Sequence, residues 1–114
     1  MSEEMDEERR QLLNDMVKLR KPVSELVVLL RAYPWDVDRP LVAVSAADVV
    51  RVLESYLSDE ISAETIYEWA DALEMREDVQ CDERVSEFFT EASTPELFEP
   101  ISGAFARRWL NCLR

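Results

Sequence analysis

The sequence predicts an all-α fold, a compact bundle of five or six helices, and three observations lead to that expectation. The 114 residues include one glycine and five prolines, so few residues suit the tight turns of β-hairpins. Helix-start signals recur along the chain, and apolar residues follow them at helical spacing. No internal repeat or low-complexity tract interrupts the pattern. We therefore expect residues 1–114 to form a single helical domain.

The first predicted helix runs from Glu3 to Arg20. Acidic residues fill its first turns and basic residues follow at its end, an order that the helix dipole favours. Its apolar arc consists of Met5, Leu12, Met16 and Leu19, with Leu13 and Val17 at the edge. Pro22 then ends this helix or begins the next one.

Residues 22–32 (PVSELVVLLRA) are apolar on nearly every side, which predicts a buried central helix. A short buried strand is the alternative, because Val27 and Val28 suit strands and periodicity does not decide for so short a run. Pro34 closes this element. The next segment, YPWDVDRPLVAV, is predicted to be an ordered loop or an extended connection. Its Tyr33–Asp36 part is either a recognition loop or a packing element.

Two further helices have serine caps. Ser45 and Asp48 have the spacing of a capping box, and Ser62 caps the helix after it. The inward residues of the first are Val49, Val52, Leu53, Tyr56 and Leu57, and those of the second are Ile66, Trp69, Ala70 and Leu73.

The last third of the chain repeats this pattern. Residues 82–92 form a helix, Thr94 and Pro95 begin a single turn, and Ser102 caps the final helix. The apolar face of residues 82–92 consists of Val85, Phe88, Phe89 and Ala92. That of the final helix consists of Phe105, Ala106, Trp109, Cys112 and Leu113.

The N-terminal residues, MSEEMDEERR, contain no apolar segment of a secretory signal, so we expect a cytoplasmic protein with reduced cysteines. Cys112 should pack on its helix face, and Cys81, in a polar connection, should be the exposed thiol. The longest apolar run, Leu26 to Leu30, is too short to span a bilayer.

Several chemistries lack their usual residues. The chain has no histidine and one glycine, which removes the commonest general base, most zinc sites and glycine-rich phosphate loops. The Asp36 and Asp38 pair has too common a spacing to indicate a metal or a glycosidase site. We therefore expect no enzyme, no metal and no cofactor. A net charge of −12 also disfavours nucleic acid and anionic membranes as partners.

The charge is concentrated in the middle of the chain. Residues 40–106 contain sixteen acidic residues and three arginines, a net charge of −13. Glu64, Glu68 and Asp71 lie opposite the core face of their helix, with Tyr67 and Glu74 along the flank. The predicted partner-binding residues are Asp59, Glu60, Glu64, Tyr67, Glu68, Asp71, Glu74, Met75, Glu77 and Asp78.

This acidity costs helix stability, because like charges four residues apart repel by about 0.2–0.5 kcal/mol. No lysine follows Lys21, although interspersed lysines would relieve the repulsion. Either the acids only keep the protein soluble, or they meet a basic partner protein. In the second case Tyr67 and Met75 would supply apolar contacts.

The stretch "YPWDVDRPLV" followed by "LESYLSDEISAETIYEWADALEMREDV" resembles a pattern of small, acidic, mostly uncharacterised bacterial proteins. Their YPWD segment precedes a helix, an L-x-x-E-[IL]-S-A-E linker and an E-W-A helix, and the resemblance covers residues 29–80. It implies a helical fold. Residues 57–69 also resemble acidic bacterial immunity proteins, through a capped helix and acidity, and no toxin-binding residue carries over.

The sequence therefore predicts a non-catalytic, acidic protein-binding domain, with an immunity-type inhibitor of a basic toxin surface as the specific hypothesis. The alternative is a structural or scaffold module that self-associates, for example as a homodimer, through apolar surface left by its first or last helix.

Overall fold

The computed structural model of the protein describes residues 3–33, 39–74 and 76–114, with side chains from Asp6 onward. Within these ranges the chain forms six α-helices, one 3-10 helix and two short strands, so the predicted helical bundle is confirmed. The elements are α1 (Glu3–Val17), α2 (Val23–Leu30), β1 (Val42–Val44), α3 (Ala46–Leu57), α4 (Ala63–Leu73), β2 (Val79–Cys81), α5 (Glu83–Ser93), η1 (Pro95–Leu97) and α6 (Gly103–Leu113).

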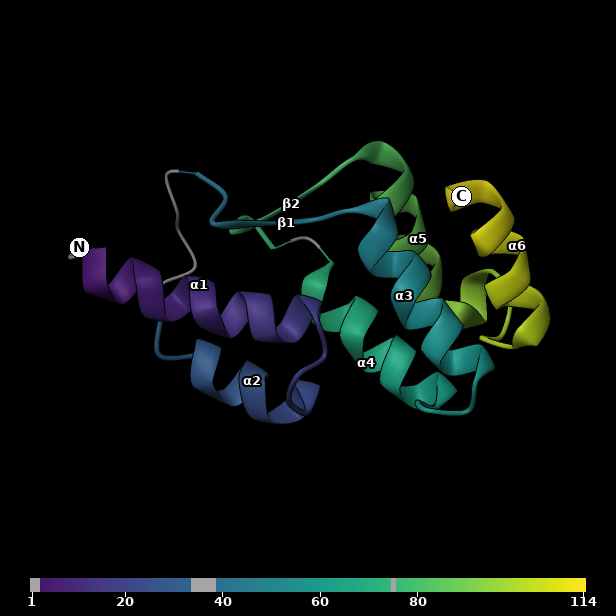
Figure 1. Ribbon diagram of the computed structural model, residues 1–114, viewed down its shortest axis with the longest axis horizontal. Helices are drawn as coiled ribbons and strands as arrows, with labels where there is room; N and C mark the ends of the chain where they lie inside the picture. Colours follow the sequence, from purple (N-terminus) through teal and green to yellow (C-terminus); the bar gives the residue numbers. More distant parts are fainter. Residues whose placement is uncertain (1–2, 34–38, 75) are drawn as a thin grey trace.

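Helix α4 joins the two halves of the fold. It packs against α1 and α2 on one side and against α3 and α5 on the other. Figure 1 shows α1 and α2 side by side at one end of the molecule, with α3, α5 and α6 at the end that carries the C-terminus. The molecule is elongated, 45 Å long and 25 Å across.

The helix α1 ends at Val17, three residues earlier than predicted. Leu19 adopts a left-handed backbone conformation with φ 53°, which a helix does not continue. Two backbone hydrogen bonds close the end: Leu19 N donates to Met16 O at 3.1 Å, and Arg20 N donates to Asp15 O at 2.9 Å. The chain then turns back, and α2 packs along α1.

The predicted apolar arc of α1 is broadly confirmed but incomplete. Leu13, Met16 and Val17 are buried, Leu12 is half-buried, and Met5 lies outside the described side chains. The helix also buries two charged residues that hydrophobic spacing does not reveal, Arg9 and Asp15.

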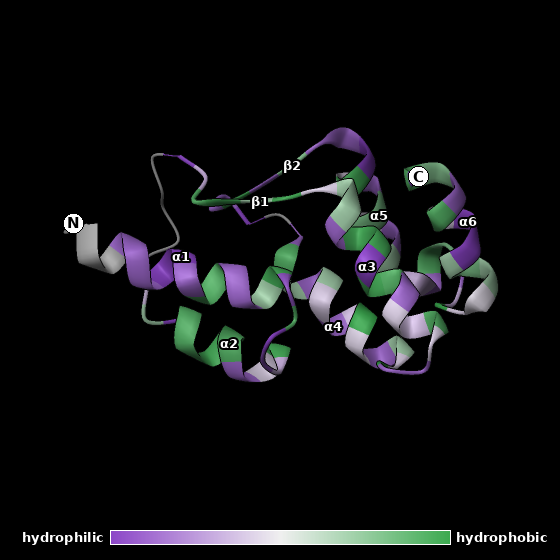
Figure 2. Ribbon diagram, viewed as in Figure 1, coloured by the Kyte–Doolittle hydropathy of each residue, from purple (hydrophilic) through white to green (hydrophobic). Residues whose placement is uncertain are grey.

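The helix α2 is confirmed as a helix, but it is not buried on every side as predicted. Val23, Leu26 and Leu30 face the core, whereas Val28 is 58% exposed and Leu29 is 45% exposed. Among the described elements, α2 packs mainly against α1 and α4, and Val28 and Leu29 lie away from these contacts. Figure 2 shows α2 coloured hydrophobic along most of its length.

The two strands form a parallel pair that the sequence did not predict. Val42 pairs with Val79 and Val44 with Cys81, and Leu41 N also donates to Asp78 O at 2.8 Å. The chain was expected to form a loop or extended connection before α3, of which residues 34–38 lie outside the described residues. The pair aligns the entries to α3 and α5, which follow the strands directly.

The core is rich in aromatic side chains contributed by α4, α5 and α6. Trp69 lies with its ring centroid 5.3 Å from that of Phe89, and Phe88 lies 5.5 Å from Trp109 in an edge-to-face arrangement. The predicted inward residues of α4 and α5 are all buried. Two predictions for the other helices were wrong, because Leu57 of α3 and Cys112 of α6 are exposed.

Helix caps account for where the later helices begin. Ser45, Ser62 and Ser102 each accept a hydrogen bond from the backbone N–H three residues later, as predicted, and Asp82 caps α5 in the same way. Thr94 differs, since its hydroxyl donates to Thr90 O at 2.6 Å and does not cap η1.

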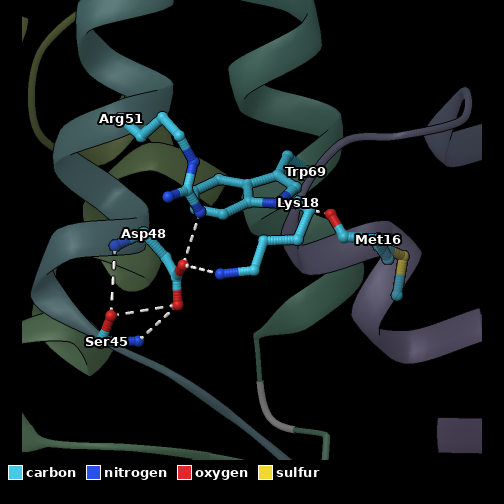
Figure 3. A network of polar contacts seen from close by, with 6 residues as sticks. All are labelled: Met16, Lys18, Ser45, Asp48, Arg51 and Trp69. Atoms are coloured by element: carbon cyan, nitrogen blue, oxygen red, sulfur yellow. Dashed lines mark hydrogen bonds and ion pairs between the residues drawn. The ribbon is translucent and has the colours of Figure 1, made fainter. Parts of the chain in front are cut away.

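The capping box of α3 also contacts Lys18, the residue that follows α1 (Figure 3). Asp48 accepts a hydrogen bond from Ser45 N at 2.9 Å, and its carboxylate lies 2.6 Å from both Lys18 Nζ and Arg51 Nη2. Burial alone would raise the pKa of Asp48, but the hydrogen bonds from Lys18, Ser45 and Arg51 outweigh it and lower that pKa.

The two cysteines have the opposite exposure to the one predicted. Cys112 is exposed on α6, where Leu110 takes the buried position instead. Cys81 is half-buried in β2. Burial and the neighbouring Asp82 carboxylate both raise the pKa of the Cys81 thiol.

Candidate functional site

The exposed face of α4 is fixed by what its opposite face buries. Ile66, Trp69 and Leu73 are buried, and Trp69 Nε1 donates a hydrogen bond to Met16 O of α1 at 2.9 Å (Figure 3). Ser62 Oγ accepts from Thr65 N at 3.1 Å at the start of the helix. These contacts prevent α4 from rotating about its axis, so the residues opposite the core point to solvent.

Three carboxylates follow one another along this exposed face. Glu64 and Asp71 are exposed, and Glu68 is half-buried. Their spacing of four and three residues brings neighbouring charges onto the same side of the helix. Among the residues that the structure describes, none of the three takes part in an ion pair. The face therefore carries three uncompensated negative charges.

A groove of about 480 Å³ lies between the exposed sides of α2 and α4. From α2 it is lined by Val23, Ser24, Val27, Val28 and Arg31, and from α4 and the residues after it by Tyr67, Glu68, Asp71, Ala72, Glu74 and Arg76. One wall is thus mainly apolar, and the other carries carboxylates. Hydrophobic grooves on other proteins bind the apolar face of amphipathic helices.

Two of the large side chains that line the groove are exposed to solvent. Val28 on the α2 wall is 58% exposed, and Tyr67 on the α4 wall is 39% exposed. Aromatic side chains next to polar ones are typical of the residues that dominate binding energy in protein interfaces. Tyr67 was expected on this face from the sequence, and the structure places it in the groove beside Glu68.

The remaining acidic residues of the predicted site have different surroundings. Asp59 and Glu60 are exposed in the turn before α4, where Asp59 has a left-handed backbone conformation with φ 62° and ends α3. Glu77 is exposed after α4, and Glu74 accepts a hydrogen bond from Ser93 Oγ of α5. Met75 lies outside the described residues.

Asp78 is not on the exposed face, although the sequence pattern included it. It is only 1% exposed, and its carboxylate accepts hydrogen bonds from Arg9 Nε at 3.0 Å and from Arg76 Nε at 2.8 Å. Burial alone would raise the pKa of Asp78, but Arg76 and Arg9 outweigh that effect and hold it below the usual range. Asp78 was included because it lies close in sequence to the acids of α4, but α4 ends at Leu73 and the chain then turns Asp78 inward.

The α2 wall of the groove was missed in the sequence. Val28 and Leu29 were assigned to a buried helix, and Arg31 was not considered. The signal in the sequence was the short connection between the first two helices, which predicts that α2 packs beside α1. A short helix that packs on one side exposes part of an all-apolar sequence.

Among the described residues, no cluster of three or more histidine, cysteine or acidic side chains has the geometry to hold a metal ion. None of the described helices combines the length and the apolar composition that a membrane crossing requires. Comparison with protein-family models, curated proteins and solved structures yields no match. The geometry of the groove and its charges is therefore what supports a function.

Proposed function

We propose that the protein is a non-catalytic binding domain that holds a basic segment of a partner protein in the groove between α2 and α4. The observation that carries the proposal is that uncompensated carboxylates and exposed apolar side chains share one groove, with Glu68 and Asp71 beside Val28 and Tyr67. A toxin-immunity inhibitor, which occludes a basic toxin surface, is the specific form of this function.

Charge argues for a cationic occupant. Glu64, Glu68 and Asp71 repel one another at a cost of about 0.2–0.5 kcal/mol per neighbouring pair. Lysine or arginine side chains of a partner would replace this repulsion by attraction. They would also raise the association rate by about 10- to 1000-fold at low salt.

Shape argues for an amphipathic occupant. Arg31 and Arg76 also line the groove, but the three acids Glu68, Asp71 and Glu74 outnumber them and leave the lining with a net charge of −1. Because the α2 wall also presents Val27 and Val28, an occupant needs an apolar face flanked by cationic side chains. A basic amphipathic helix meets both requirements. Its apolar side chains would pack against Val28 and Tyr67 in the centre, and its cationic side chains would pair with Glu68 and Asp71.

The proposal is tested with an amphipathic leucine–lysine peptide as a probe, followed by amide NMR shifts and stopped-flow association at several salt concentrations. We expect shifts along α2 and α4, and an association rate that falls as salt rises. A triple variant, Glu64→Lys, Glu68→Lys and Asp71→Lys, should slow association about tenfold or more at low salt and flatten the salt dependence.

A matched control changes the same number of exposed acids on α5 and η1: Glu83→Lys, Glu87→Lys and Glu96→Lys. This control carries the same net charge, so it should retain most of the association rate if the α4 face is responsible. Equal slowing by both variants would contradict the proposal, because it would mean that total charge alone attracts the probe.

The apolar part of the groove needs its own test. Tyr67→Ala should weaken binding by about 2 kcal/mol, or about thirtyfold in Kd, mainly by faster dissociation. Leu97→Ala removes an exposed apolar side chain outside the groove and serves as the control. The same variants can then be compared for capture of a basic protein from the source cell. Unchanged dissociation of the probe from Tyr67→Ala would contradict the assigned role of Tyr67.

A self-associating structural module is the second candidate. Its support is a pair of exposed apolar side chains at the end of η1: Leu97 is 73% exposed, and Phe98, the residue after the helix, is 53% exposed. Sedimentation at several salt concentrations distinguishes the two functions. A dimer that salt does not affect and that Leu97→Ser with Phe98→Ser dissociates would favour self-association through η1. A monomer in every condition would count against it.

A further inference from the structure

Three arginines line one small cavity in a chain whose net charge is −12. The cavity has a volume of about 300 Å³. Arg9 reaches it from α1, Arg31 from the end of α2, and Arg76 from the residues between α4 and β2. Three guanidinium groups thus share one cavity in a chain that has many more acidic than basic residues.

Asp78 accounts for only part of this positive charge. Arg9 uses Nε and Nη2 to contact Asp78 Oδ2, at 3.0 and 2.9 Å. Arg76 contacts both oxygens of the same carboxylate, with Nε 2.8 Å from Oδ1 and Nη2 2.9 Å from Oδ2. Each of these guanidinium groups therefore has its Nη1 left over.

The unused donors point to a missing acceptor. Arg9 is 2% exposed, and its Nη1 is buried without a hydrogen-bond partner in the described part of the chain. A buried donor in this state loses free energy that an acceptor would restore. Arg31 is exposed, and its guanidinium makes no side-chain hydrogen bond to any described residue. Arg9 and Arg31, which both line the cavity, thus each have guanidinium donors without a partner among the described residues.

The other residues that line the cavity indicate which charge and which surface a ligand would need. Glu77 and Asp78 offset two of the three positive charges, which leaves the cavity with a net charge of +1. Val27, Leu30 and Tyr33 supply apolar and aromatic surface. We infer that the cavity binds a small organic anion with one carboxylate and an apolar body, the carboxylate on Arg9 and Arg31 and the body against Val27 and Leu30.

A carboxylate fits better than a phosphate for two reasons. A phosphate monoester carries about −1.5 to −2 charges at neutral pH and would be repelled by Glu77 and Asp78. A planar carboxylate matches the paired N–H groups of a guanidinium and needs only one positive charge. The site is distinct in ligand from the proposed protein-binding groove, although the two share Val27, Arg31 and Arg76.

The test is an amide NMR titration of the full chain with benzoate as the probe. Benzamide, its neutral isostere, and inorganic phosphate are titrated in parallel. We expect benzoate to shift the amides of Leu30, Arg31 and Glu77, and both comparison compounds to bind at least about tenfold more weakly. Equal binding of benzamide would overturn the role of the arginines, and equal or tighter binding of phosphate would overturn the carboxylate assignment.

Two variants locate the binding. Arg31→Gln removes an exposed guanidinium and should weaken benzoate about tenfold, while Arg107→Gln on α6, also exposed, should leave it unchanged. Glu77→Gln removes a competing carboxylate and should tighten benzoate. Equal effects of Arg31→Gln and Arg107→Gln, or weaker binding by Glu77→Gln, would overturn the inference. Because benzoate lacks cationic groups, neither result depends on whether the groove binds a basic protein.

Discussion

Replacing Asp78 by asparagine should be the most destabilising single charge change in this fold. Asp78 is 1% exposed and is the counter-charge of Arg9, which is 2% exposed. In Asp78→Asn the Arg9 guanidinium stays buried, and among the described residues a neutral amide oxygen replaces the carboxylate that it contacts. Arg76 is affected less, because 18% of its side chain remains accessible to solvent.

The size of the loss follows from the burial of Arg9. Removing one partner of a buried ion pair costs about 3–5 kcal/mol, since an uncompensated charge is left in a poorly solvated site. Asparagine keeps one acceptor, so we expect about 3 kcal/mol. A domain of this size has about 5–15 kcal/mol of stability in total. At about 4 °C per kcal/mol, the midpoint of thermal unfolding should fall by about 12 °C.

Urea unfolding followed by tryptophan fluorescence measures this loss, because Trp69 and Trp109 are buried. Asp71→Asn is the control: the same chemical change at an exposed carboxylate should alter stability by less than about 0.5 kcal/mol. The double variant Arg9→Met with Asp78→Asn should recover at least half of the loss, because it also removes the stranded charge. A cost below about 1 kcal/mol, or a double variant as unstable as the sum of the two single variants, would refute the reasoning.

Three further predictions concern stability and reactivity. The pKa values of Asp48 and Asp78 are lowered in the folded state, so these carboxylates stabilise the fold fully above the unfolded-state pKa of about 3.9. This stabilisation is lost as the pH falls toward the folded-state pKa values. Urea unfolding between neutral and acid pH should show the loss, and Asp48→Asn should reduce it. Ser45→Ala should cost about 1 kcal/mol in urea, and no measurable cost would mean that the capping box adds nothing. A thiol reagent should modify Cys112 before Cys81, so Cys112→Ser should remove the faster phase; loss of the slower phase would contradict the assignment.

The parts of the fold that were predictable are those that short-range chemistry decides. Ser45 and Ser62 specify helix starts through contacts with residues three positions away, and Trp69 lies in the core because the helical period places it with Ile66. The pairing of β1 with β2 depends on contacts between segments far apart in the chain, and three-residue strands have no periodicity to detect. For the same reason, the exposure of Val28 could not be read from α2 alone.

In the candidate site, too, the residues placed by the helical period were predictable and those placed by long-range contacts were not. The exposure of Glu64 and Asp71 follows from the helical period, which holds as far as the helix does. Asp78 was misplaced because α4 ends at Leu73, and the chain then carries Asp78 into a buried contact with Arg9. Such an ion pair joins residues from opposite halves of the sequence, so a pattern of charges along one helix does not predict it.

The distribution of ion pairs also bears on why the α4 face remains negative. The buried acids attract the nearby cations: Asp15 pairs with Arg20 and Lys21, Asp48 with Lys18 and Arg51, and Asp78 with Arg9 and Arg76. Burial makes a counter-charge essential for these acids, whereas an exposed acid is solvated by water without one. The other ion pairs of the described residues join more exposed acids to arginines: Glu7 to Arg10, Glu54 to Arg114, and Glu91 and Glu99 to Arg108. No ion pair of the described residues involves Glu64, Glu68 or Asp71, so their negative charges remain available to the basic partner that we propose. Placing a lysine beside them, as in Thr65→Lys, should therefore weaken partner binding without a gain in folding stability larger than about 0.5 kcal/mol.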